Sequence, residues 1–240
     1  ILAAFHFSST AQTHRIDSLL TVLKTQKEDT SKANTLFELT RAYLFELNDN
    51  QKVGEYGAQQ LELSLKLNFK KGISYGYLNR GIFYRTSGDY HKAMVFDKKC
   101  LAVMREIGNK KGESSCLLNI GLTLYQQGNF TEALDYISKG LQIKILLGDK
   151  KGMASAYNNT GNIYYTLGNY KEALSYCLKA QKIREEMHDE VGLSMGYNNM
   201  GNVFNALNKY EDALLYYTKS LRINEKLKDQ SGIGNAFTNI

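Results

Sequence analysis

Residues 157–174 read YNNTGNIYYTLGNYKEAL, and this stretch decides the fold. One apolar face recurs every three or four residues, as on an α-helix, at Ala154, Tyr157, Thr160, Gly161 and Tyr164. The residues from Leu167 to Tyr170 interrupt that spacing, and their Gly-Asn pair is typical of a turn. A second helical face follows at Ala173, Tyr176, Cys177, Ala180 and Ile183. The stretch therefore predicts two helices joined by a tight turn.

The same pattern recurs every 40 residues without insertion. Four columns keep this register: Gly72, Gly112, Gly152, Gly192 and Gly232; Gly81, Gly121, Gly161 and Gly201; Asn79, Asn119, Asn159, Asn199 and Asn239; Ala93, Ala133, Ala173 and Ala213. Repeats of this length are typical of solenoids in which each unit packs only on its neighbours. The register therefore predicts a stack of similar helix pairs.

Small residues in this register predict how the two helices of a pair meet. A glycine in the middle of a helix costs about 1 kcal/mol relative to alanine, and the cost recurs in the column that contains Gly161. We expect close approach of the second helix, with its small Ala column, to compensate for it. An aromatic residue is expected to close each turn, at Tyr90, Phe130, Tyr170 and Tyr210.

These motifs resemble the tetratricopeptide repeat (TPR) family. The resemblance covers about residues 33–240 and is sharpest from residue 73 onward. The sequence departs from the family in its 40-residue unit, where about 34 is usual, in lacking the proline after the second helix, and in carrying no Trp. These departures resemble the 40-residue subclass found in signalling scaffolds and sensors. The resemblance implies an all-α, right-handed superhelical solenoid of antiparallel helix pairs.

The register also divides the chain into parts. We expect a degenerate unit at 33–72, four full units at 73–112, 113–152, 153–192 and 193–232, and the start of a further unit at 233–240. A capping helix is expected within residues 13–32. Residues 1–12 resemble the end of a secretory signal peptide, with a disordered leader as the alternative. Because the last unit stops inside a first helix, we expect the sequence to be a fragment of a longer protein.

Composition and motifs argue against most catalytic classes. The chain has 240 residues, 43% of them apolar, with three Cys, no Pro, no Trp and a formal net charge of +6. The Gly-x-Ser-x-Gly pattern of hydrolases occurs at 72–76 and 192–196, but it lacks the preceding strand that a nucleophile elbow needs, so we interpret it as a helix start. Cys100 and Cys177 are expected to pack in the core, and a disulfide between Cys100 and Cys116 is the alternative in an exported protein. We expect no enzyme activity, no cofactor and no metal site.

The Asn columns are the strongest candidates for binding. The resemblance places them in the concave groove, where TPR proteins bind extended peptides, and a carboxamide can both donate and accept hydrogen bonds. The predicted groove residues are Asn119, Asn158, Asn159, Asn162, Tyr125, Tyr165, Asn198, Asn199 and Asn202. The alternative for the Asn columns is hydrogen bonding between stacked repeats. The positions of the family's carboxylate clamp hold Leu78, Leu118, Asn158, Asn198, Tyr75 and Ser115, which does not support such a clamp.

The sequence thus predicts a non-catalytic interaction domain that binds a peptide or protein segment in its groove. We expect it to be the sensing or scaffolding part of a longer bacterial signalling protein, exported to the periplasmic side, with other domains of the same protein as further partners. The alternative is a cytoplasmic adaptor that docks a partner protein. The paired lysines at 70–71, 110–111 and 150–151 are interpreted as solvated edges, so neither a nucleic-acid partner nor direct membrane insertion is expected.

Overall fold

The computed structural model describes the backbone of residues 2–47 and 49–240, and the side chains of 14–44, 47 and 49–240. Within these residues the chain is all-α, as predicted, and holds no strand. The elements are α1 (Leu2–Thr25), α2 (Thr30–Ala42), the π-helical turn η1 (Tyr43–Leu47), α3 (Asn50–Lys66), α4 (Lys70–Thr86), α5 (Tyr90–Glu106), α6 (Lys110–Gln126), α7 (Phe130–Leu146), α8 (Lys150–Thr166), α9 (Tyr170–Glu186), α10 (Glu190–Ala206), α11 (Tyr210–Leu227) and α12 (Gln230–Asn239). None of the described helices is long and apolar enough to cross a membrane.

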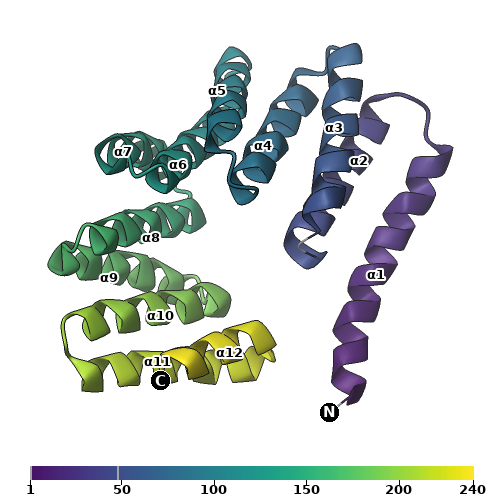
Figure 1. Ribbon diagram of the computed structural model, residues 1–240. Coiled ribbons are helices and arrows are strands. Elements are labelled where there is room, and N and C mark those ends of the chain that lie inside the picture. Colours follow the sequence, from purple (N-terminus) through teal and green to yellow (C-terminus); the bar gives the residue numbers. More distant parts are fainter. Residues whose placement is uncertain (1, 48) are drawn as a thin grey trace. The chain divides into compact units, whose positions relative to one another are not determined.

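The chain divides into two compact units, residues 1–127 and 128–240, which we call unit 1 and unit 2. Unit 1 contains α1 to α6 and unit 2 contains α7 to α12 (Figure 1). The predicted pairs form the tightest packing, α4 with α5 in unit 1, and α8 with α9 and α10 with α11 in unit 2. Within each unit the first helices of successive pairs also touch, α4 with α2 and α6, and α8 with α10. The first helices therefore line the inner face of each unit.

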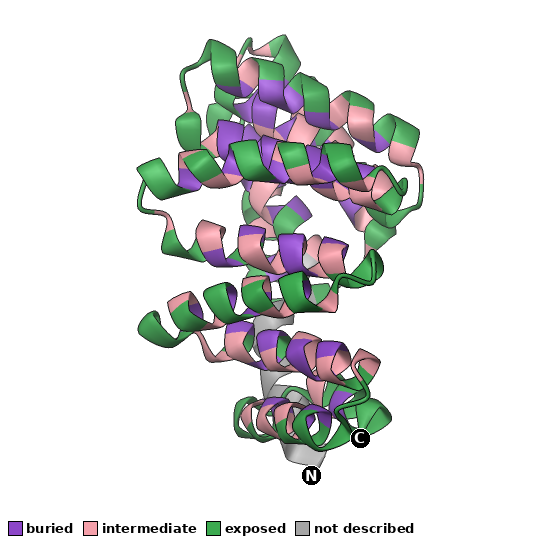
Figure 2. Ribbon diagram, turned by 90° about the vertical axis from the view of Figure 1, so that its left-hand side faces the viewer, coloured by how far each residue is buried: buried purple, intermediate pink, exposed green. Residues whose placement is uncertain are grey.

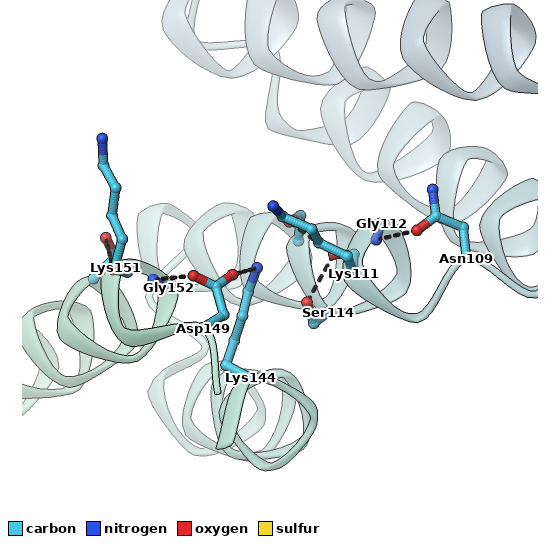
Figure 3. A network of polar contacts seen from close by, with 10 residues as sticks. Asn109, Lys111, Gly112, Ser114, Lys144, Asp149, Lys151 and Gly152 are labelled. Carbon is cyan, nitrogen blue, oxygen red and sulfur yellow. Dashed lines mark hydrogen bonds and ion pairs between the residues drawn. The ribbon is translucent and has the colours of Figure 1, made fainter. Parts of the chain in front are cut away.

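Left-handed residues and side-chain caps end one helix and start the next. Gly108 and Gly148 have φ angles of 65° and 63°, which glycine adopts without strain. The next residues, Asn109 and Asp149, each accept a hydrogen bond at 2.9 Å from the backbone N–H three residues on (Figure 3). Lys144 also donates to Asp149 at 2.8 Å. A left-handed glycine followed by a capping side chain therefore forms each of these two joints.

The mid-helix glycine column lies where the paired helices come closest. A Cβ added to Gly161 would lie 3.3 Å from the backbone oxygen of Ala173 and 3.3 Å from the Sγ of Cys177, both on α9. Ala173 is itself fully buried. The close approach predicted from small residues is therefore confirmed for α8 and α9, and buried residues lie between the paired helices of Figure 2.

The aromatic residues at the turns do not all close their turns as the sequence predicts. Tyr170 packs against Tyr165, with ring centroids 5.7 Å apart, and is half-buried. Tyr210, by contrast, is 64% exposed and donates a hydrogen bond to Asn208, so it does not close its turn. Asn208 replaces the turn glycine with a φ of 58°, and its side chain accepts the hydrogen bond from the hydroxyl of Tyr210 in this exposed turn.

Helix α1 runs through residues 2–25 and so spans both the expected capping helix and the leader segment. Buried Ile16 joins the core with Leu39 and Val53, as expected of a capping helix. The side chains of residues 1–13 lie outside the described residues, and the signal-peptide interpretation remains a prediction.

Candidate functional site

A hollow of about 440 Å³ opens on the inner face of unit 2, where α8, α10 and α12 meet the end of α11. Its wall is made almost entirely of carboxamides, hydroxyls and exposed apolar side chains: Asn158, Asn162, Val191, Ser194, Met195, Asn198, Asn199, Ser220, Asn224, Leu227, Asp229, Ser231, Gly232 and Asn235. Four of the predicted groove residues lie in it, namely Asn158, Asn162, Asn198 and Asn199. The register brings them together because residues 40 apart fall at equivalent places on adjacent first helices.

The Asn columns also bond the repeats to one another. Asn199 on α10 donates to the Oδ1 of Asn158 at 3.0 Å and to that of Asn162 at 3.3 Å, both on α8. Asn239 on α12 donates to the Oδ1 of Asn198 at 2.8 Å. These bonds tie successive first helices to one another. A buried or half-buried carboxamide without such a partner would cost about 1–3 kcal/mol.

The other predicted residues are distributed differently. Tyr165 and Asn202 line a second, smaller hollow of about 20 Å³ beside Gly161, Cys177 and Val203. Asn202 accepts a hydrogen bond from the hydroxyl of Tyr217 at 2.8 Å, and burial raises the pKa of that hydroxyl. Asn159 is half-buried and lines neither hollow. Asn119 and Tyr125 belong to α6 of unit 1.

Several lining residues of unit 2 were not predicted from the sequence. Ser194 donates to the Oδ1 of Asn224, and Ser220 donates to the backbone oxygen of Ser194 at 2.9 Å. Ser194 belongs to one of the two Gly-x-Ser-x-Gly patterns, and it lies inside α10, as the helix-start interpretation requires. Asn224 was detectable as a polar residue in a buried position of a second helix, at the place where Lys144 and Arg184 stand in the preceding pairs.

Unit 1 holds a hollow of about 530 Å³ that sequence reasoning missed. It is lined by Phe37, Arg41, Tyr75, Leu78, Asn79, Ile82, Met104, Asn109, Lys111, Gly112, Ser115 and Cys116. Phe37 of α2 and Tyr75 of α4 stack with ring centroids 4.5 Å apart. The Asn column reaches this hollow through Asn79, and Tyr75, Leu78 and Ser115 stand at the positions of the family's carboxylate clamp. Arg41 stands 40 residues before Gly81, in the glycine column of the degenerate unit, and Lys111 belongs to one of the paired-lysine edges.

Behind this hollow, unit 1 buries a charged network. Asp97 on α5 is 1% exposed and accepts from Thr123 at 2.8 Å and from Arg85 at 3.5 Å. Burial raises the pKa of Asp97 to about 6, although Arg85 and Thr123 act in the opposite direction. Burial likewise lowers the pKa of Arg85, which also donates to Asn119 at 3.4 Å. The network holds α4, α5 and α6 together and explains why Asn119 faces the core.

The remaining reactive side chains are buried or bonded within the fold. Cys100 and Cys116 are free and buried, and a hydrogen bond between the two thiols together with burial raises the pKa of Cys100. Burial raises the pKa of Cys177 to about 11. Low thiolate content makes Cys100 and Cys177 poor nucleophiles. Among the described residues no group of His, Cys, Asp and Glu side chains could hold a metal ion.

Comparison with known proteins supports the repeat assignment. A family model described as tetratricopeptide repeat matches residues 73–145 and 152–226. No curated protein sequence matches significantly.

Among solved structures, the chain is similar to BtubC (BKLC) from P. vanneervenii, at 19% identity and a TM-score of 0.69, over 92% of this chain and 91% of that chain. It is similar to a signal transduction ATPase with numerous domains that carries a tetratricopeptide repeat sensor, from Pyrococcus horikoshii, at 20% identity and a TM-score of 0.66, over 99% of this chain and 40% of that chain. It is also similar to a Rap protein complexed with Competence and Sporulation Factor, at 16% identity and a TM-score of 0.72, over 98% and 71% of the two chains. At these identities the likeness establishes the fold.

Proposed function

The chain belongs to the tetratricopeptide repeat family, and on this premise we propose that it is a non-catalytic interaction module that binds an extended peptide on the inner face of unit 2. The observation that carries the proposal is the carboxamide-lined hollow of about 440 Å³ between α8, α10 and α12. Carboxamides can bond a peptide backbone through both its N–H and its C=O groups without selecting a side chain.

Exposed apolar side chains stand beside these amides. Val191 and Met195 of α10 are 57% and 56% exposed, although both lie on the inner face. Methionine adapts its shape to different partners, and exposed apolar surface beside polar groups is typical of binding sites. A bound peptide would cover both side chains, and the burial of their apolar surface would contribute to the binding free energy.

A second part of the proposal concerns the biological setting. We propose that the domain is the sensing or scaffolding part of a bacterial signalling protein on the exported side of the membrane. The structural likeness to a signalling ATPase with a repeat sensor, of which the chain spans 40%, supports the sensing role. The second candidate is a cytoplasmic adaptor. Alkaline phosphatase fused after residue 240 of the native gene product would be active under the first setting and inactive under the second.

Peptide binding is tested by selecting a phage-displayed dodecapeptide library on the folded chain. The affinity of a selected peptide is then measured for the wild type and for a double variant, Met195→Ala with Asn235→Ala, at two exposed positions of the hollow. The matched control is Leu178→Ala with Asn205→Ala, which also removes one exposed apolar and one exposed Asn side chain outside that hollow. We expect the first pair to weaken binding about tenfold and the control to leave it unchanged. Equal affinities for the two variants would contradict the proposal.

A further inference from the structure

The two cysteines of unit 1 face each other across the interface between α5 and α6. Cys100 on α5 and Cys116 on α6 are equally far along the chain from Gly108, the left-handed glycine of the joint between these helices. One helical turn closer to that joint, the helices touch so tightly that a Cβ added to Gly112 would collide with the Sδ of Met104. The thiols of Cys100 and Cys116 form the next contact, and they are hydrogen-bonded to each other.

Hydrogen bonds on both sides of the two cysteines fix the register of α5 against α6. Towards the joint, the Nε of Arg105 donates to the Oε1 of Glu113 at 2.8 Å. Away from the joint, the hydroxyl of Thr123 donates to the Oδ2 of Asp97 at 2.8 Å. Both bonds join α5 to α6, so the thiols that lie between them are held opposite each other.

The equivalent places in unit 2 show how closely the helices approach at this point. They hold pairs of small residues, Gly140 with Ala156, Ala180 with Gly196, and Ser220 with Ala236. All of these positions are buried, and so are Cys100 and Cys116, which are 0% and 1% exposed. Helices that approach this closely bring the two Cβ atoms toward the separation of about 3.5–4.5 Å that a disulfide requires.

One of the two thiols borders a space that a small molecule can enter. Cys116 lines the hollow of about 530 Å³ in unit 1, whereas Cys100 does not line it. A small uncharged oxidant that enters the hollow therefore meets the sulfur of Cys116 first. Cys177 is the remaining cysteine of the chain, and it lies buried in unit 2 without a second thiol in that unit.

We propose that Cys100 and Cys116 are a redox modification site, at which hydrogen peroxide closes a disulfide that joins α5 to α6. In the first step the sulfur of Cys116 attacks one oxygen of the peroxide, the O–O bond breaks, and a sulfenic acid and one water form. In the second step the sulfur of Cys100 attacks the sulfenic sulfur, the S–O bond breaks, and the S–S bond forms with release of a second water. The two thiols lose two electrons in total, and the peroxide is reduced to two waters.

The surroundings of the two thiols make this reaction slow and direct it toward the internal disulfide. The hydrogen bond with Cys116, burial and the charge of Asp97 all raise the pKa of Cys100, so its thiolate content is low. The second step nevertheless takes place within one contact, because the sulfenic sulfur forms beside the Cys100 thiol. Burial of both sulfurs also keeps larger thiols away from the sulfenic acid.

The test exposes the folded chain to a small excess of hydrogen peroxide, removes the excess with catalase, and counts free thiols with dithiobis-nitrobenzoate in guanidinium. The wild type is compared with Cys100→Ser, Cys116→Ser and Cys177→Ser. Cys177→Ser is the matched control, because it removes an equally buried thiol outside the pair. Intact mass separates a disulfide, which loses two hydrogens, from oxygen addition, and electrophoresis without reductant detects links between chains. Circular dichroism checks the fold of each variant before treatment.

We expect the wild type to lose two of its three thiols and two hydrogens without dimerising, and Cys177→Ser to lose both of its thiols. Cys100→Ser and Cys116→Ser should form no internal disulfide. The disulfide should raise the melting temperature by about 5 °C, because it constrains the unfolded chain, and dithiothreitol should reverse the rise.

Four results would overturn the inference: no loss of thiols, oxygen addition without a linkage, a linkage between two chains, or a melting temperature lowered by the linkage. The same loss of thiol from Cys177 as from the pair would also overturn it. If a serine variant of the pair fails to fold, the wild type and Cys177→Ser decide the question. Peptide binding in unit 2 takes no part in this test, so the proposed function fails or stands separately.

Discussion

The two units use the same repeat and fill equivalent places with opposite chemistry. In unit 1, Arg85, Asp97 and Thr123 form a buried charged network across α4, α5 and α6. Eighty residues on, unit 2 has Tyr165, Cys177 and Val203, which line the small hollow of about 20 Å³. The first helices differ likewise: α2, α4 and α6 of unit 1 are rich in basic residues, whereas α8 and α10 of unit 2 are rich in carboxamides.

This difference shows which parts of the repeat are constrained by packing. The Gly and Ala columns recur because paired helices approach closely there, and a larger side chain has no room. The position of Asp97 is also buried in every pair, yet it holds Asp, Ile, Cys or Tyr at 97, 137, 177 and 217. Such positions need burial and a satisfied partner, so they can change chemistry while the fold stays the same.

The largest expected effect comes from breaking the charged network of unit 1. Arg85→Ala leaves the Asp97 carboxylate buried without its cation, and we expect a loss of about 3 kcal/mol of unfolding free energy at pH 8. Tyr165→Ala, at the equivalent position of unit 2, removes a side chain that is 38% exposed and should cost less than about 1 kcal/mol. Urea denaturation followed by circular dichroism measures both.

Transplanting the chemistry of unit 2 into unit 1 sharpens this test. The triple variant Arg85→Tyr, Asp97→Cys, Thr123→Val replaces the charges with the side chains of unit 2. Replacing a buried ion pair by well-packed residues is often neutral or stabilising, so the triple variant should regain the stability lost in Arg85→Ala. If the triple variant is as unstable as Arg85→Ala, the side chains of unit 2 cannot replace the charged network of unit 1.

The second prediction concerns pH, and it applies to unit 1 alone. The folded pKa of Asp97, about 6, lies above its usual value of 3.8, so the native state holds this proton over a range where the unfolded chain has lost it. Stability from this group is present below about pH 4 and falls by about 2–3 kcal/mol as the pH rises through 6. The unfolding free energies of the wild type and of Asp97→Asn, compared from pH 4 to 7, isolate the contribution of Asp97. The lowered pKa of Glu113 makes stability change with pH in the opposite direction, and it affects both proteins equally.

The third prediction tests the constraint that both units share. Gly161→Leu forces a side chain against the backbone oxygen of Ala173, which cannot move without shifting α9, so we expect a loss of about 2 kcal/mol. Thermal melting measures it. A melting temperature equal to that of the wild type would mean that α8 and α9 can separate at little cost.

The fourth prediction separates the two roles of the Asn columns. Asn162 and Asn202 accept hydrogen bonds from Asn199 and Tyr217, so a double change of both to Ala should cost about 1–2 kcal/mol. Asn235→Ala, at an exposed position with no such bond in the described structure, should leave the melting temperature unchanged and weaken binding of a selected peptide. If the double variant kept its melting temperature and lost peptide binding, while Asn235→Ala lowered the melting temperature, Asn162 and Asn202 would be binding residues and Asn235 a structural one.

The smallest effect is expected at the solvated edge of unit 2. Lys150 pairs with Glu186 at 2.8 Å, but the two side chains are 56% and 45% exposed. Surface ion pairs contribute little, so Lys150→Ala should change the unfolding free energy by less than about 0.5 kcal/mol. A larger loss in the same denaturation assay would show that the ion pairs between the two helices of a pair contribute to the stack.

The sequence by itself determined the helix pairs, their turns and their close contacts. The apolar spacing stops at Gly168 and Asn169 and resumes on the second helix, and Gly161 opposite Ala173 permits close approach of the two helices. The same register also located the Asn residues on the first helices.

The tertiary structure alone decided which of those residues face a hollow and which bond a neighbour. Asn199 reaches Asn158 and Asn162 because α8 and α10 touch, while Asn119 faces Arg85. The hollow of unit 1 also became visible only there, because Phe37, Tyr75 and Lys111 come from three helices far apart in the sequence. A repeat pattern shows what each position shares with its equivalents, whereas a site depends on side chains that differ between repeats and meet only after packing.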